Sequence, residues 1–205
     1  MQYAIGVSDF SIDILRPYLN PNIQLTKIYS PIDFQIEEQV DFTKNEYFLY
    51  VGRLNKEKGV NLFCQAVTEL GKKGIVVGDG DEKQRLEQQY PTIEFTGWKS
   101  KREVEEYMKK AKCLIFPSLW YETAGLTILE AQVLGIPSLV SNRCAGKEFV
   151  EEWFTFDNQN IEELKEKMLQ IEKYDKKITV LYDYSKSNYI KQLLQFFENI
   201  MLETN

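Results

Sequence analysis

Short apolar runs alternate with longer segments of helical period along most of this chain. The apolar runs lie at residues 46–52, 74–78, 92–97, 113–117 and 137–141. Between the first two runs, the apolar positions recur at helical spacing, at Leu62, Phe63, Ala66, Val67 and Leu70. Strands that alternate with helices in this way typically build a parallel sheet covered on both faces. The pattern therefore predicts an α/β fold with a Rossmann-like parallel sheet and helices on both faces.

Residues 113–142 form the unit around which the other segments are arranged. They read as strand, loop, helix, turn and strand, with the helix stopped before Gly135 and Pro137. The first amides of a helix have no intrahelical acceptor, and with the helix dipole they favour an anion. Gly125 allows a ligand to approach this backbone closely, and Leu126 and Thr127 follow with free amides. We therefore expect a phosphate group at this helix start.

Two carboxylates flank the same helix start. Glu122 lies in the loop before the helix, and Glu130 lies on the helix, about 6 Å along the axis from Leu126. This arrangement suits a site that holds sugar hydroxyls beside a phosphate. The spacing of the two acids is commonplace, so surface roles for both remain the alternative.

Two cations follow the first predicted strand. In open parallel sheets, ligands bind beyond the carboxyl ends of the strands, where the loops 53–59 and 118–125 are expected. Arg53 and Lys58 could neutralise a leaving group that gathers negative charge. The alternative is a pair of solvated surface charges beside Lys56.

The two ends of the chain differ from this alternating core. Residues 1–40 are expected to be the end of a mostly absent preceding domain plus a linker, with a helix over 8–19 capped by Ser8 or Asp9. A βαβ arm on the main domain is the alternative. Residues 186–205 predict a C-terminal helix packing back on the fold. Its apolar face would also suit weak peripheral membrane association or a partner, but its mixed charge favours intramolecular packing.

Composition excludes several classes of function. With 25 basic and 31 acidic residues the net charge is −6, which disfavours general nucleic-acid binding. The chain has no histidine and three dispersed cysteines, which argues against a zinc site and against any histidine-based triad. Reduced thiols, the lack of a signal-peptide pattern and the lack of an apolar run of about 20 residues predict a cytoplasmic protein.

Four motifs in order give the chain a family resemblance. FLYVGRLNKEKG, VVGDGDE, IEFTGW and YETAGLTILEAQVLGIPSLVS resemble the C-terminal domain of the group 1 (family 4) glycosyltransferases, which have the GT-B fold. The resemblance implies that residues 41–185 are a nucleotide-sugar-binding domain and that a missing N-terminal domain carries the acceptor site. It implies transfer of a sugar from a nucleoside-diphosphate donor with retention of anomeric configuration, without metal or other cofactor. A fragment without its N-terminal domain would bind donor but turn over little.

The resemblance also implies roles for individual residues. Arg53 and Lys58 would face the diphosphate, Glu122 would contact the donor sugar and stabilise its cationic transition state, and Glu130 would hold the ribose hydroxyls. The further donor-binding positions are Gly52, Gly78, Gly80, Trp98, Gly125, Leu126 and Thr127. The chain departs from the family pattern at Thr123 and Ala124, where the family commonly has a glycine or proline and then a bulky residue. This departure leaves the identity of the donor sugar open.

Several alternatives stay open at this point. Asp79, Gly80 and Asp81 form a D-x-D triplet, which binds manganese in other glycosyltransferases, but here Gly80 reads as a turn and Asp81 as a helix N-cap. Trp98 could stack on the base or simply pack in its loop. The competing functions are a non-catalytic nucleotide-binding or interaction domain and a nucleotide-sugar epimerase or sugar phosphorylase of related fold. The last two usually need further catalytic groups, often a histidine.

Overall fold

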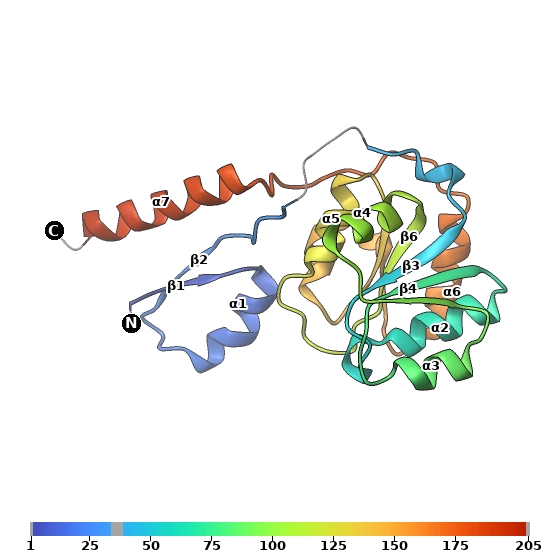
Figure 1. Cartoon of the computed structure of the whole chain (residues 1–205). Coiled ribbons are helices and arrows are strands. Elements are labelled where there is room, and N and C mark those ends of the chain that lie inside the picture. The colour runs from blue at the N-terminus through green and yellow to red at the C-terminus, as the bar shows by residue number, and fades with distance from the viewer. Residues whose placement is uncertain (1, 34–38, 204–205) are drawn as a thin grey trace.

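A computed structural model describes residues 2–33 and 39–203. Within these residues, six parallel strands form one sheet in the order β5-β4-β3-β6-β7-β8 (Figure 1). The strands are β3 (Tyr47–Val51), β4 (Lys73–Val77), β5 (Glu94–Gly97), β6 (Ala111–Phe116), β7 (Ser138–Ser141) and β8 (Thr155–Phe156). The central strands are buried on both sides, which explains why their sequences are continuous apolar runs without alternation. The predicted fold class is confirmed.

Helices cover both faces of this sheet. α2 (Val60–Glu69) packs against α6 (Ile161–Ile171) on one face, on the same side as α3 (Lys83–Gln89). α4 (Lys101–Lys109) and α5 (Leu126–Val133) cover the other face (Figure 1). Large apolar side chains from both layers and from the strands join in one core cluster.

The helix boundaries follow mostly from local chemistry. α4 begins with a capping box, in which Ser100 and Glu103 each satisfy the other's backbone amide. The prediction that Asp81 caps α3 is wrong, because the N-cap is Glu82 and it makes no side-chain capping bond. The backbone N–H of Glu82 instead donates to the carbonyl of Leu54, at 2.9 Å. The N–H of Lys83, the first residue of α3, donates to the carbonyl of Gly80 at 3.1 Å, so backbone carbonyls and not a side chain serve these amides.

The first residues form a small unit of their own. β1 (Tyr3–Gly6) and β2 (Gln24–Lys27) pair in parallel with each other and not with the six-stranded sheet. Between them, α1 (Asp9–Leu15) starts at Ser8, which confirms one of the two predicted N-caps. A 3-10 helix, η1 (Arg16–Tyr18), follows it. The sheet and α1 lie on one side of the main body (Figure 1).

Irregular segments and short 3-10 helices connect the remaining elements. Residues 34–46 are polar and are expected to be a linker. Of these, residues 34–38 lie outside the described part of the chain, and η2 (Phe42–Lys44) lies among the others. The other 3-10 helices are η3 (Lys56–Lys58), η4 (Ala145–Phe149) and η5 (Glu152–Phe154). Beside the linker, the N–H of Ile32 donates to the carbonyl of Tyr184 at 3.1 Å, so the segments entering and leaving the main body touch.

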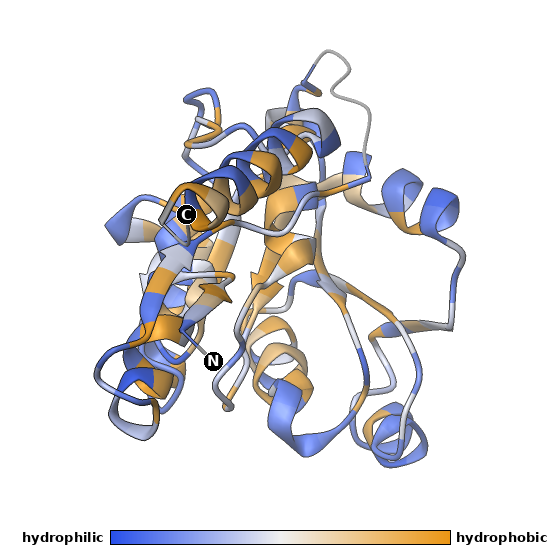
Figure 2. Cartoon of the chain, turned by 90° about the vertical axis from the view of Figure 1, so that its left-hand side faces the viewer, coloured by the Kyte–Doolittle hydropathy of each residue, from blue (hydrophilic) through white to orange (hydrophobic). Residues whose placement is uncertain are grey.

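The last helix, α7 (Lys186–Glu203), extends from the main body on the same side as β1 and β2 (Figures 1 and 2). One row of its apolar side chains is half-buried, including Tyr189, Leu193 and Phe196. Another row is exposed, including Ile190 and Leu194, and no residue from 186 to 202 is buried. That this helix packs back on the fold stays a prediction. Among the described helices, none combines the length and apolar character needed to cross a membrane.

Candidate functional site

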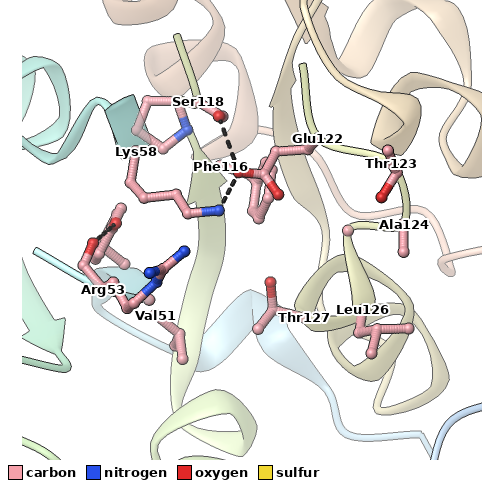
Figure 3. Close-up of a pocket in the computed structure, with 14 residues that line it drawn as sticks. Val51, Arg53, Lys58, Phe116, Ser118, Glu122, Thr123, Ala124, Leu126 and Thr127 are labelled. Atoms are coloured by element: carbon pink, nitrogen blue, oxygen red, sulfur yellow. Dashed lines mark hydrogen bonds and ion pairs between the residues drawn. The ribbon is translucent and has the colours of Figure 1, made fainter. Parts of the chain in front are cut away.

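A cavity of about 350 Å³ opens at the carboxyl ends of β3 and β6. These strands are neighbours in the sheet, but the chain continues from them to opposite sides, to β4 and to β7. Loops that diverge in this way leave a crevice between them, which is the usual ligand site of open parallel sheets. The lining residues come from the end of β3, the end of β6, the loop before α5 and the start of α5 (Figure 3).

The cavity gathers the two predicted cations and one predicted carboxylate. The ammonium group of Lys58 pairs with the carboxylate of Glu122 across the cavity, and both side chains are only about one-fifth exposed, at 21% and 19%. Arg53 lines the same space, and its carbonyl accepts a hydrogen bond from the hydroxyl of Tyr50 at 2.8 Å. Figure 3 shows the charged ends of Arg53, Lys58 and Glu122 directed toward one another. The structure therefore brings together the three residues predicted to be catalytic.

The start of α5 forms another wall of the cavity. Gly125 is the N-cap with φ of +63°, a conformation that strains any residue with a Cβ atom. No side chain caps this helix, so the free amides at its start are left available beside the cavity. The hydroxyl of Thr127 is buried without a hydrogen-bond partner and points toward the cavity (Figure 3). Leu126 also lines it, as predicted. This wall therefore offers unsatisfied donors to an anionic ligand.

Among the predicted donor-binding positions that follow β3, β4 and β5, Gly52 lines the cavity, whereas Gly78, Gly80 and Trp98 are not part of its lining. Gly78 has φ of +141°, and a Cβ atom there would lie 1.9 Å from the carbonyl oxygen of Gly52. Gly80 is packed in the same way against the backbone of Leu54. The two glycines thus hold the β4 loop against the β3 loop. Trp98 is 75% exposed and does not line the cavity. Their contacts with a donor stay predictions.

Glu130 lies further along α5 and also does not line the cavity. Its pKa is raised to about 7, chiefly because burial disfavours the charged form. Lys101 on α4 opposes this shift, and Glu105 on the same helix adds to it. Strongly raised pKa values are frequent at functional sites, so Glu130 remains a candidate although it lies outside the lining of this cavity.

The D-x-D triplet does not form an open carboxylate pair. One carboxylate oxygen of Asp79 accepts from the N–H of Gly80 at 2.8 Å, and the other lies 3.4 Å from the ammonium of Lys83. Within residues 2–33 and 39–203, no group of three or more His, Cys, Asp or Glu side chains is arranged to hold a metal ion.

Sequence reasoning missed a group of buried polar residues that contact Glu122 and its neighbours. The hydroxyl of Ser118 lies 3.4 Å from the carboxylate of Glu122. The carbonyl of Ser118 in turn accepts from the hydroxyl of Ser141 at 2.7 Å and from the side-chain amide of Asn158 at 3.2 Å. Ser118, Ser141 and Asn158 are all buried. Their spacing carries no motif, because β6, β7 and the segment after β8 meet only in the folded sheet.

The fold is that of known glycosyltransferase structures. Sucrose-phosphate synthase from Thermosynechococcus elongatus superimposes with a TM-score of 0.83 at 18% identity, over 98% of this chain and 59% of that one. Anabaena HepE, solved in complex with UDP-glucose, superimposes with a TM-score of 0.80 at 18% identity, over 97% of this chain and 64% of that one. The molecule therefore has the architecture of the GT-B glycosyltransferases, as predicted.

Sequence comparison then shows the family. The family model described as "Glycosyl transferases group 1" matches residues 31–188, and the chain belongs to this family. An Escherichia coli UDP-Gal:alpha-D-GlcNAc-diphosphoundecaprenol alpha-1,3-galactosyltransferase is 28% identical over 67% of this chain and 40% of its own length. The E. coli O-antigen biosynthesis glycosyltransferase WclY is 34% identical over 52% of this chain and 32% of its own length. The match thus spans less than half of each relative, and the family resemblance is confirmed.

Proposed function

We propose that this chain is the donor-binding part of a retaining glycosyltransferase that uses a nucleoside-diphosphate sugar. The observation that carries the proposal is the convergence of Arg53, Lys58, Glu122 and the uncapped start of α5 on one cavity. Family membership and structural neighbours that contain UDP or UDP-glucose support it.

In the proposed reaction, the bond between the anomeric carbon and the β-phosphate oxygen breaks, and a bond from that carbon to an acceptor hydroxyl oxygen forms on the same face. The hydroxyl proton leaves with the nucleoside diphosphate. Negative charge grows on the diphosphate as the first bond breaks. Arg53, Lys58 and the amides of Leu126 and Thr127 would stabilise that charge, and such stabilisation is usually the largest catalytic contribution.

The two glutamates would hold the two sugars of the donor. Glu122, at the cavity wall, would accept hydrogen bonds from the transferred sugar and stabilise positive charge near its anomeric carbon. Glu130, deeper along α5, would accept from the ribose hydroxyls in its ionised form. Gly78, Gly80 and Trp98 would lie near the base.

The remaining parts of the proposal concern cofactors, the acceptor site and the cellular location. The charges that would receive the diphosphate are supplied by Arg53, Lys58 and α5, so the proposal includes no metal or other cofactor. The acceptor would bind on an N-terminal domain beyond the small β1–β2 unit, and the chain alone would turn over little donor. We also propose that the protein acts in the cytoplasm, where nucleotide sugars are the donors.

Titration calorimetry of the chain with UDP, GDP, ADP, UDP-glucose and GDP-mannose tests the proposal. We expect saturable binding of one nucleotide and its sugar, weakened by Arg53→Ala. Arg16→Ala, in η1, is the matched control because Arg16 lies outside the cavity lining. A wild-type chain that binds none of these ligands would leave only the non-catalytic interaction role.

A further inference from the structure

The loop that carries Glu122 is tied to a distant part of the chain, the small unit of β1, α1 and β2. The hydroxyl of Ser8, the N-cap of α1, donates to the carbonyl of Thr123 at 2.8 Å. Ser8 is fully buried, and its oxygen also accepts from the N–H of Ser11 at 3.0 Å. One side chain therefore both starts α1 and binds the residue that follows Glu122.

A second contact ties α1 to the turn after β7. One carboxylate oxygen of Glu148, in η4, accepts from the N–H of Asp9 at 3.0 Å, and the other accepts from the N–H of Phe10. These are first-turn amides of α1 that have no intrahelical acceptor. A carboxylate at this end of a helix is also favoured by the helix dipole.

A third contact joins η4 directly to the Glu122 loop. The N–H of Ala145, also in η4, donates to the carbonyl of Glu122 at 2.8 Å. Glu122 and Thr123 thus have successive carbonyls bonded to η4 and to α1, while η4 and α1 are bonded to each other through Glu148. Three segments far apart in the sequence form one closed ring of hydrogen bonds.

Side chains of the same three segments also contact one another through aromatic rings. The rings of Phe10 on α1 and Tyr121 in the Glu122 loop have centroids 5.9 Å apart. The ammonium of Lys147 in η4 lies 5.1 Å from the centroid of Phe10. Each of the three segments therefore also contributes a side chain to these contacts.

We propose that Ser8 and Glu148 are positioning residues, which fasten α1 to the Glu122 loop and hold the Glu122 carboxylate where it meets the transferred sugar. This inference rests on the proposed function for its ligand, but the fastening itself is a property of the ring of hydrogen bonds. Neither residue lines the cavity, so both act through the backbone of residues 122 and 123.

Hydrogen exchange of the full chain tests the fastening without any ligand. We expect Ser8→Ala and Glu148→Gln each to speed exchange in residues 118–125 by about tenfold, the effect of losing one hydrogen bond. Ser8→Thr, which keeps the hydroxyl, should restore slow exchange. Asp13→Asn, an exposed change on the same helix, should leave it unaltered. Unchanged exchange in both Ser8→Ala and Glu148→Gln would overturn the proposal.

Calorimetry with UDP and UDP-glucose tests the positioning role. We expect Ser8→Ala to reduce the affinity gained from the sugar by about tenfold while UDP binds as in wild type, because only the sugar meets Glu122. If Ser8→Ala exchanges faster but the difference in affinity between UDP-glucose and UDP is unchanged, the positioning role would be overturned. A wild-type chain that binds none of UDP, GDP, ADP, UDP-glucose and GDP-mannose would instead count against the proposed function, and hydrogen exchange would still test whether Ser8 and Glu148 hold the Glu122 loop.

Discussion

Replacing Glu130 by glutamine should stabilise the protein most at neutral and higher pH, and the gain should shrink to nothing as the pH falls to about 4.5. Burial raises the pKa of Glu130 to about 7 from the ordinary value of 4.5. Between these values the folded protein holds a proton that the unfolded chain has released, so wild-type stability falls as pH rises through this window. The side chain of glutamine has nearly the same shape and carries no charge to bury.

The size of the effect follows from the shift. A difference of roughly 2.5 pKa units, at about 1.36 kcal/mol each, amounts to roughly 3 kcal/mol at about pH 8. For a chain of this size, that corresponds to a rise in Tm of roughly 6–12 °C. Below about pH 4.5 the carboxyl is protonated in both states, and the difference between wild type and Glu130→Gln should vanish.

Urea unfolding of wild type and Glu130→Gln at several pH values between about 5 and 8 measures this difference. Glu166→Gln, an exposed change on α6, controls for the loss of one negative charge. A gain of equal size at both ends of the pH range, or no gain at all, would refute the argument that burial of this charge sets its pKa.

The same titration should govern donor affinity if Glu130 holds the ribose. An ionised carboxylate accepts hydroxyl hydrogen bonds more strongly than a protonated one. The affinity for UDP-glucose, whose diphosphate diester does not titrate near pH 7, should therefore rise from about pH 6 to pH 8 in wild type. Calorimetry on Glu130→Gln should show weaker binding without this rise. A pH-dependent gain that survives in the variant would assign the titration to another group.

Two further predictions concern the cavity and its support. Lys58→Ala should weaken UDP binding by about 10- to 150-fold, the value of one charge-assisted hydrogen bond, whereas Lys56→Ala in the same turn should not; calorimetry that shows equal losses would remove the diphosphate role of Lys58. Gly78→Ala should cost about 2 kcal/mol or more in urea unfolding, because its Cβ would lie 1.9 Å from the carbonyl oxygen of Gly52. Gly71→Ala, at a φ of +62° with open space around it, should cost less, and an equal cost there would exclude the clash as the main cause.

Hydrophobic periodicity predicted the strands and helices of the main body, because a strand buried on both faces is a continuous apolar run and a helix buried on one face is apolar at helical spacing. Local capping chemistry predicted Ser8 as the start of α1 for a similar reason. It failed at Asp81, where the helix begins one residue later than expected and the N–H of its N-cap, Glu82, donates to the carbonyl of Leu54 in another loop. A short-range rule has no access to such a partner.

The candidate site was predictable where loops follow strands, and not where loops meet one another. Strand ends located Arg53, Lys58 and Glu122, since parallel strands present their carboxyl ends at one edge of the sheet. The ion pair between Lys58 and Glu122 spans 64 positions, and the bond from Ser8 to Thr123 spans 115. Contacts at such separations depend on the packing of whole elements, so they leave no local signal.

The adjacency of β3 and β6 also has a practical consequence. The two halves of the cavity follow different strands and meet only in the folded sheet, so a molecule that bridges them can bind the folded protein and not the unfolded chain. Any such molecule raises the melting temperature in proportion to the logarithm of its concentration once the site is saturated. Screening nucleotides by thermal shift can therefore identify the donor before any acceptor is known.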